Sequence, residues 1–324
     1  MNKVFFGDCR DSMRDLIAQG IKVQMCVTSP PYYGLRDYGH DGQLGLEATP
    51  DEFVDNLVEV FGLVRELLTD DGVLWLNLGD SYAGSGKGSN PDGTPHPSTL
   101  AGKQGTNTGT VTGINKPQKA AAIGLKPKDL IGIPWMVAFA LRADGWYLRQ
   151  DIIWHKPNPM PESVTDRCTK SHEYIFLLSK SARYYFDSAA IAEPLTESSR
   201  IRNQSGWNGN EERDYVSGKQ NNMSKYLGSE KAKEATERNK RSVWTVPTTP
   251  YSGAHFATFP PALIEPCILA GSRIGDTVLD PFFGSGTTGQ VSQALGRKWI
   301  GCELNPAYGE LQQVRTAQQG MEFV

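Results

Sequence analysis

The stretch Ser29-Pro30-Pro31-Tyr32 combines a hydroxyl group, rigid backbone carbonyls and an aromatic ring within four positions. Its prolines fix φ and favour extended conformations in the residues before them, so the Ser29 hydroxyl and the Pro30 carbonyl are held in place. The amine of a nucleobase is a poor nucleophile, because its lone pair is delocalised into the ring. Two acceptors on its hydrogens favour tetrahedral geometry and free that lone pair, and Tyr32 offers a face for stacking. On its own, the stretch also fits an ordinary turn after a strand.

A glycine-rich turn lies about 250 residues further on, in Asp280-Pro281-Phe282-Phe283-Gly284-Ser285-Gly286-Thr287. Its glycines match the G-x-G-x-x-G pattern, and Glu303 follows about 20 residues later, where an acid binds ribose hydroxyls. Both a dinucleotide and S-adenosylmethionine suit this pattern. Asp280 favours S-adenosylmethionine, because a carboxylate attracts its ammonium group and repels a pyrophosphate. The aromatic pair before the glycines can cover the uncharged adenosyl or thioether part.

The composition is that of an ordinary soluble protein with a sizeable core. Of its 324 residues, 39% are apolar and 21% are charged, and the net charge is −3. Any nucleic-acid surface must therefore be a local basic patch. The five cysteines form no C-x-x-C pair or zinc pattern, which predicts reduced thiols and no structural metal. No signal peptide or membrane-spanning run is apparent, so we expect a cytoplasmic protein of a bacterium, archaeon or phage.

Apolar runs alternate with helical patterns along the chain, which predicts a mostly parallel sheet. The clearest helix begins at Pro50, with Thr49 as N-cap and Glu52 in a capping box, and Asp70-Asp71-Gly72 is expected to end it. Further helices are expected over 134–145 and after residues 261, 286 and 306. The expected fold is α/β, with a doubly wound, mostly parallel, Rossmann-like sheet. Its seven strands are expected at residues 3–7, 23–28, 72–78, 146–154, 173–179, 277–279 and 298–303.

Two polar segments, 83–126 and 191–243, interrupt this alternation. The first is rich in Gly, Asn, Thr and Ser and contains Lys87 and Lys103. It fits either a surface loop or a basic flap that orders on a phosphate backbone. The second contains Arg200, Arg202 and Asn203, whose side chains are of the types that read base edges. Its acidic residues fit a solvated helical insertion equally well, so composition leaves both interpretations open.

The two motifs and several other short elements stand in a fixed order along the chain. Together they resemble the elements of the amino-methyltransferases of DNA. The similarity is to the permuted group of that family, whose catalytic motif precedes the cofactor motif, and it covers most of the chain. Its elements are Gly7-Asp8-Cys9, the motif ending at Tyr32, residues 151–161 with Ser171-His172-Glu173-Tyr174-Ile175, His255-Phe256-Ala257-Thr258-Phe259-Pro260, residues 280–287, and Gly301-Cys302-Glu303-Leu304-Asn305.

The resemblance implies a role for each motif residue. Ser29, Pro30, Pro31 and Tyr32 would act on the target base, which such enzymes take out of the duplex. S-adenosyl-L-methionine is the implied cofactor, with Asp8 and Cys9 framing its adenine. The other implied cofactor-binding residues are His255, Ala257, Thr258, Phe259, Pro260, Asp280, Phe282, Gly284, Ser285, Gly286, Thr287, Glu303 and Asn305. The implied DNA contacts are Arg200, Arg202, Asn203, Lys87 and Lys103.

The motif order also implies how the chain is organised. Residues 1–82 would form the catalytic half of the methyltransferase domain, residues 127–190 would continue that domain, and 244–324 would be its cofactor-binding half. The loop 83–126 interrupts the first part, and 191–243 is the expected target-recognition insertion. The implied partner is double-stranded DNA, with a homodimer expected and no membrane association. A cognate restriction nuclease cannot be identified from the sequence.

Several alternatives stay open. Ser at the first motif position is typical of cytosine-N4 enzymes in this family, and it favours cytosine as the target base. Asn158-Pro159-Met160-Pro161 is also at home among adenine-N6 enzymes, so adenine stays the alternative. A nicotinamide-dependent oxidoreductase would share the glycine pattern but leaves Ser29–Tyr32 unexplained. An idle DNA-binding module would not need Asp280 and Glu303. His172 and Lys156 are left out of the expected catalytic set, because a lone His beside a strand usually has a structural role.

Overall fold

The computed structural model describes residues 1–35, 39–40, 42–83, 124–205, 229–248 and 259–317. It divides the chain into two compact units. The larger contains residues 1–186 and 242–324, and the smaller contains residues 187–241. Among the helices of these described ranges, none is both long and apolar enough to cross a bilayer.

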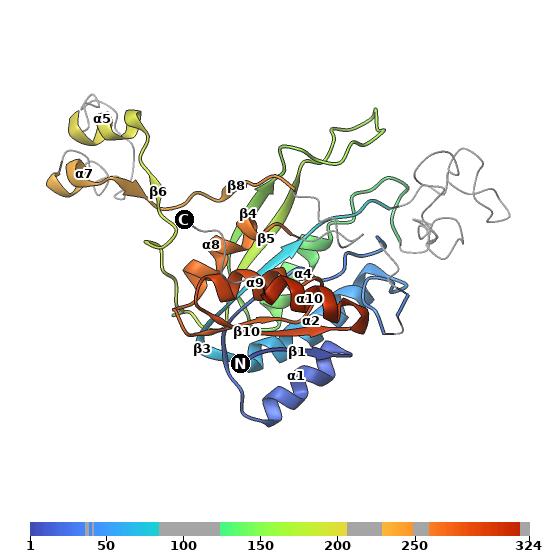
Figure 1. Ribbon diagram of the computed structural model, residues 1–324. Helices are drawn as coiled ribbons and strands as arrows, with labels where there is room; N and C mark the ends of the chain where they lie inside the picture. Colours follow the sequence, from blue (N-terminus) through green and yellow to red (C-terminus); the bar gives the residue numbers. More distant parts are fainter. Residues whose placement is uncertain (36–38, 41, 84–123, 206–228, 249–258, 318–324) are drawn as a thin grey trace. The chain divides into compact units, whose positions relative to one another are not determined.

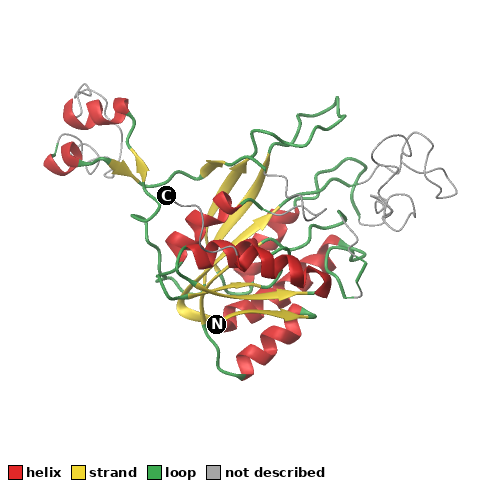
Figure 2. Cartoon of the chain, in the orientation of Figure 1, coloured by secondary structure: helices red, strands yellow, loops and turns green. Residues whose placement is uncertain are grey.

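The larger unit is built on one mixed sheet, shown in Figure 1 and Figure 2. Its strand order is β1-β10-β9-β2-β3-β5-β4-β8. Only β5 runs antiparallel to its neighbours, β3 and β4; the other pairs are parallel. The strands are β1 (Asn2–Phe6), β2 (Val23–Thr28), β3 (Leu68–Leu78), β4 (Tyr147–His155), β5 (His172–Ser179), β8 (Val243–Thr245), β9 (Thr277–Asp280) and β10 (Lys298–Glu303).

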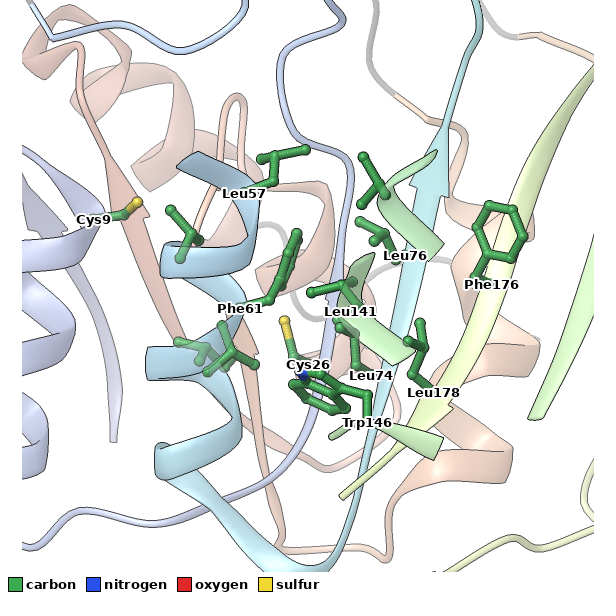
Figure 3. Close-up of a cluster of buried hydrophobic side chains, with 14 of the residues drawn as sticks. Cys9, Cys26, Leu57, Phe61, Leu74, Leu76, Leu141, Trp146, Phe176 and Leu178 are labelled. Carbon is green, nitrogen blue, oxygen red and sulfur yellow. The ribbon is translucent and has the colours of Figure 1, made fainter. Parts of the chain in front are cut away.

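Helices cover both faces of this sheet, because successive residues of a strand point to opposite sides. On β3, Leu74 and Leu76 join the buried cluster that contains Phe61 of α2 and Leu141 of α4, as Figure 3 shows. Trp75, between these two leucines, faces the other side of the sheet, where it lies against Gly271 of α8. The first layer is α1 (Cys9–Ala18), α2 (Pro50–Leu67) and α4 (Ile133–Ala143), and the second is α8 (Pro261–Gly271), α9 (Thr287–Ala294) and α10 (Gly309–Ala317).

The mostly parallel, doubly wound sheet confirms the expected fold class. The seven expected strands are present, and β8 adds an eighth beside β4. Three residues are too few to show an alternation, so the sequence carried no signal for β8. Val243 was expected in the polar insertion, but it belongs to this strand of the sheet.

Helix α2 begins as predicted but ends earlier. The Thr49 side chain accepts from the Glu52 backbone N–H, and the Glu52 side chain accepts from the Thr49 backbone N–H, so the capping box is confirmed. The helix ends at Leu67, and Leu68 already pairs with Val23 in the sheet. The next paired residue on β3 is Val73. The polar residues expected to end the helix therefore lie in an irregularity of β3.

Helix α1 was not predicted from the sequence. Asp8 is its N-cap and accepts from the Arg10 backbone N–H. Met13 and Leu16 are buried on its inner face. Their three-residue spacing is typical of a helix. Gly7-Asp8-Cys9 was instead interpreted as an element that frames the cofactor adenine.

The described part of the smaller unit, residues 187–205 and 229–241, contains two short strands and two short helices. β6 (Glu193–Pro194) pairs antiparallel with β7 (Glu237–Arg238). The helices α5 (Glu197–Ser205) and α7 (Glu230–Glu234) contact each other. Glu193 forms ion pairs with Arg238, Lys240 and Arg241 at 3.5 to 3.6 Å. The buried side chains of this unit include Ala232 and Asn203.

Candidate active site

The carboxyl ends of the parallel strands share one edge of the sheet, which we call the site edge. β2, β3, β4, β9 and β10 end here, and the antiparallel β5 begins here with His172. The chain runs from β2 to β3 on one side and from β9 to β10 on the other, and the helices of these connections cover opposite faces. The pair β2–β9 is therefore a topological switch point, where α/β sheets bind ligands. Both sequence motifs follow these two strands.

The amide of Asn77, near the end of β3, gathers the first motif. Its Nδ2 atom lies 3.2 Å from Ser29 Oγ, 2.9 Å from Tyr32 Oη and 3.2 Å from Glu173 Oε2. Asn77 is buried, and its Oδ1 atom has no partner in the part of the chain that the structure describes. One amide nitrogen therefore brings together three side-chain oxygens from separate segments of the site edge.

Glu173 of β5 connects the tyrosine to a cation. Tyr32 Oη donates to Glu173 Oε2 at 2.7 Å, and Lys156 Nζ is paired with the other carboxylate oxygen, Oε1. The Lys156 ammonium also lies 4.1 Å from the centre of the Trp154 ring. Burial raises the pKa of Tyr32 well above its ordinary value, and the Glu173 charge raises it further. Tyr32 is therefore a protonated donor at physiological pH.

The Tyr32 ring lies directly against the backbone of Gly79. A Cβ atom at this position would be 2.4 Å from Tyr32 Cε2, closer than any real contact. Gly79 follows β3 directly, so the end of that strand fixes both the hydroxyl of Tyr32, through Asn77, and the plane of its ring. Ser29 is half-buried and Pro30 is buried beside it.

Asp280 joins the two motifs from inside the sheet. Its Oδ1 atom accepts from Thr28 Oγ1 at 2.6 Å and from the Phe282 N–H at 3.0 Å, and Oδ2 accepts from Thr288 Oγ1 at 2.6 Å. Burial raises the pKa of Asp280 to about 6, against the lowering effect of these hydrogen bonds. The carboxyl group fastens β9 to β2 and to the start of α9.

This burial changes the role expected for Asp280. Its side chain was expected to meet an ammonium group of the cofactor, but it is 1% exposed and both oxygens already have protein partners. In this geometry its hydrogen bonds to the Phe282 N–H and the Thr288 hydroxyl hold the glycine turn in place. Phe283 was likewise expected to cover the cofactor, but it is buried and stacks on Trp299 with ring centres 5.0 Å apart. Phe282, which is half-buried, remains available.

Glu303, the last residue of β10, holds the glycine turn in place. Its Oε2 atom accepts from the Gly284 N–H at 2.7 Å, and Oε1 accepts from the Asn305 N–H at 2.8 Å. Burial raises the pKa of Glu303 to about 7, and the nearby Asp280 charge adds to this. Each carboxylate oxygen can accept a second hydrogen bond. Glu303 is 8% exposed, against 1% for Asp280, and each of its oxygens accepts a hydrogen bond from a backbone N–H, so it is the better placed of the two carboxylates to receive a pair of hydroxyl groups.

The glycine turn ends in the N-terminus of α9. Gly284 and Gly286 both have positive φ, at 52° and 88°, which side chains rarely tolerate. Gly286 is the N-cap of α9, and Thr287 is the first helical residue. Ser285 is buried and accepts from Arg315 of α10. Ser285 and Thr287 therefore support the turn, while the helix N-terminus faces the site edge and favours an anionic group.

The remaining expected cofactor residues are placed less evenly. Asp8 is half-buried and accepts hydrogen bonds from the Arg10 guanidinium through both carboxylate oxygens. These bonds lower the pKa of Asp8. Cys9 is buried, and burial raises the pKa of its thiol to about 12. Asn305 caps the short helix η4 (Pro306–Tyr308). Phe259 is half-buried and the buried Pro260 caps α8. The expected residues His255, Ala257 and Thr258 lie outside the described residues.

The expected DNA contacts lie in two places. Arg200 and Arg202 are exposed on α5 of the smaller unit, whereas Asn203 beside them is 7% exposed. A side chain so buried is poorly placed to reach a base, so the two arginines are the stronger candidates. Lys87 and Lys103 lie outside the described residues. Within the described ranges, no three His, Cys, Asp or Glu side chains are grouped as metal ligands.

The sequence interpretation gave no role of its own to four residues of the site edge: Thr28, Asn77, Lys156 and Glu173. Thr28 was named only as part of the first motif and Glu173 only as part of the resemblance, and Lys156 was considered and left out of the catalytic set. Asn77 sits inside the apolar strand β3, and a single buried polar residue in such a strand is a signal that was available. Glu173 lies beside His172 at the half-buried start of β5 and gave no such signal.

Comparison with known proteins decides the family. The family model described as DNA methylase matches residues 23–314, which is most of the chain and includes both motifs. The chain belongs to the DNA methylase family. This methylase is 44% identical to the type II methyltransferase M.SmaI of Serratia marcescens, over 97% of this chain and 90% of that protein. It is also 44% identical to M.Cfr9I of Citrobacter freundii, over 95% of this chain and 85% of that protein. It is therefore a DNA methyltransferase of the N4/N6 family.

Solved structures share the methylase fold at low identity. The PvuII DNA methyltransferase (cytosine-N4-specific) aligns with a TM-score of 0.60 and 17% identity, covering 99% of this chain and 88% of that one. A DNA modification methylase from Thermus thermophilus, complexed with S-adenosyl-L-methionine, aligns with a TM-score of 0.54 and 21% identity, covering 99% and 98%. The methylase therefore has the Rossmann-like fold of these enzymes.

Proposed function

We propose that this methylase transfers a methyl group from S-adenosyl-L-methionine to the N4 amine of a cytosine flipped out of double-stranded DNA. The observation that supports this most directly is the fastening of the Ser29–Tyr32 motif beside the glycine turn through Thr28 and Asp280. The two motifs thus lie at one switch point, where a base and a cofactor can meet. Transfer of the same methyl group to adenine N6 is the second candidate, because Ser29 and Pro30 can accept from either amine.

The residues of the cofactor half fit S-adenosyl-L-methionine. Glu303 would accept hydrogen bonds from the two ribose hydroxyls, and the N-terminus of α9 would attract the carboxylate of the methionine part. Phe282 would pack against the adenosyl part. The cofactor supplies an electrophilic methyl group on a sulfonium. The ligand of the Thermus thermophilus methylase is consistent with this choice.

The residues of the catalytic half would bind and prepare the base. The Pro30 carbonyl and one lone pair of Ser29 Oγ would accept the two hydrogens of the amine, while Asn77 occupies another lone pair of Ser29. Tyr32 would stack on the base, in a plane that Gly79 sets. Alignment of the amine with the methyl group accounts for much of the rate, since well-oriented reactants gain up to about 7–11 kcal/mol.

We also infer that the smaller unit reads the target sequence. It interrupts the sheet domain between Phe186 and Ser242, and its helix α5 exposes Arg200 and Arg202. Arginine reads guanine edges through two hydrogen bonds. The homodimer remains a prediction, which light scattering of the purified protein would test.

Methylome sequencing of methylation-deficient cells that express the protein tests the proposed function, because it reports the modified base and its sequence context together. The matched control is Ser29→Ala, which we expect to bind cofactor normally and to lower the single-turnover rate, since the lost acceptor matters most in the transition state. N4-methylcytosine at a defined site would support the proposal, N6-methyladenine would establish the second candidate, and unmodified DNA would contradict both.

A further inference from the structure

A largely buried side-chain network outside the Ser29–Tyr32 motif and the glycine turn lies behind the tyrosine of the site edge. It consists of Asn77, Lys156 and Glu173, from β3, the residue after β4, and the start of β5. Its hydrogen bonds to the first motif are those with Tyr32 and Ser29. The network therefore acts on the first motif from the protein side.

The hydroxyl of Tyr32 is held by two partners of opposite kind. It donates to Glu173 at 2.7 Å and accepts from Asn77 at 2.9 Å. With both the donor and an acceptor position of the phenol filled, and with Gly79 against one face of the ring, rotation of the ring about its own axis and tilt of its plane are both restricted. Ordered aromatic planes lose less entropy when a ligand stacks on them.

Glu173 itself is fixed by a charge. The Lys156 ammonium is paired with its second oxygen, and the side chains of this pair are 18% and 15% exposed. Hydrogen bonds to an ionised carboxylate are stronger than neutral ones. Removing Lys156 would leave a largely buried charge with its neutral partners alone, and the carboxylate would be drawn away from Tyr32 toward water.

We propose that Glu173, held by Lys156, is a positioning residue that sets the Tyr32 ring in the orientation on which the flipped base stacks. This inference rests on the proposed function. It gives Glu173 of β5, which lies outside both motifs, an influence on the retention of the base that acts through Tyr32. It also gives Lys156 a function without any contact with substrate.

A double-mutant cycle tests the inference. Tyr32→Phe removes the hydroxyl that Glu173 holds, and Glu173→Ala removes the acceptor. If Glu173 acts through that hydroxyl, each variant slows single-turnover methylation by a similar factor, on the order of 10-fold or more, and the double variant is no slower than the worse single one. Lys156→Met should show a smaller loss that Lys156→Arg restores. Multiplying effects in the double variant would overturn the inference.

Two further measurements separate positioning from folding and from cofactor binding. The DNA would be a duplex carrying the site found by methylome sequencing, with 2-aminopurine in place of the target base. Its fluorescence rise on binding should fall for Glu173→Ala and Lys156→Met, while cofactor affinity by calorimetry stays at the wild-type value. Unchanged fluorescence would contradict a positioning role.

The matched control is Glu162→Gln, which breaks the comparable Glu162–Arg167 ion pair in the loop before β5. It should change neither rate nor fluorescence, and an equal loss there would show that any ion pair of this region matters equally. Failure of the proposed function is a separate outcome, because the wild-type protein would then methylate no DNA at all.

Discussion

The Thr28 hydroxyl donates to the Asp280 carboxylate across 252 positions of sequence, at 2.6 Å. Both residues are almost completely buried, and they are the last residues of adjacent parallel strands. The residue after each of them lies in a motif. This hydrogen bond adds to the backbone pairing of β2 with β9 in fixing the base site relative to the cofactor site.

We expect Thr28→Val to destabilise the protein and to weaken cofactor binding. Valine keeps the volume of threonine but leaves Asp280 short of one donor, and an unsatisfied buried acceptor costs about 1–3 kcal/mol. Urea denaturation would measure the loss of stability, and calorimetry the loss of affinity. Thr316→Val is the control, because within the described residues its hydroxyl bonds to carbonyls of its own helix alone. Equal stability of the two variants would contradict the role given to Thr28.

Glu303 should make stability depend on pH in a defined window. Its pKa is raised from an ordinary value of 4.5 to about 7, so the folded protein holds a proton that the unfolded chain has released. The stability that this bound proton gives the folded protein is fully present below the ordinary pKa of 4.5. It is lost as the pH rises through about 7. As pH rises through this window the Glu303→Gln variant should therefore gain about 3 kcal/mol relative to wild type. Parallel curves of unfolding free energy against pH would refute this.

The same titration should affect ligand binding in the opposite direction. A protonated Glu303 can no longer offer two charge-assisted acceptors to the ribose, which are worth about 1.5–3 kcal/mol each at most. The affinity for S-adenosyl-L-methionine should fall as pH drops below about 7 in wild type, and the fall should be absent in Glu303→Gln. Calorimetry across this range would check it.

Gly79→Ala should reduce methylation while leaving cofactor affinity intact. The added methyl group would lie 2.4 Å from the Tyr32 ring, so the ring must move from its plane. The matched control is Gly62→Ala in α2, where an added Cβ meets no atom within 4 Å. That variant should be fully active and slightly more stable, by up to about 1 kcal/mol. Wild-type turnover in Gly79→Ala would show that the plane of Tyr32 is not critical.

Substitutions in α5 should change target preference rather than chemistry. Each arginine contact to a base edge discriminates by about 1–3 kcal/mol, so Arg200→Ala and Arg202→Ala should broaden the methylated sequence. Asn203→Ala should instead lower the stability of the smaller unit, because that side chain is buried. Methylome profiles and protease sensitivity would distinguish the two effects. An unchanged site with both arginines replaced would place sequence reading elsewhere.

The sequence predicted the elements of this fold better than the contacts of its site. Thr49, Glu52 and Pro50 marked the start of α2 because capping is a local interaction. The position of Asp280 was also right, but its role depends on how deeply β9 is buried between β2 and β10, which is a property of the assembled sheet. Whether a carboxylate at a strand end points outward or inward is decided by its neighbours, here Thr28 and Thr288.

The network behind Tyr32 was beyond sequence reasoning for a similar reason. Asn77 and Glu173 meet because β5 runs antiparallel to β3, so that the start of one strand lies at the end of the other. A sequence pattern predicts that both segments are strands, but not their relative direction. Lys156 reaches the same place from the end of β4, the other neighbour of β5.

The strand order also determines when this enzyme can become active during its synthesis. β1 has β10 as its neighbour, and β9 with β10 fills the space between β1 and β2. The ribosome delivers these two strands after all the others of the sheet, so the nascent chain exposes the flanks of β1 and β2 until then. A prematurely terminated product would lack the middle of its own sheet and be a substrate for proteases. Only a chain that extends through β10 can hold both motifs at the β2–β9 switch point.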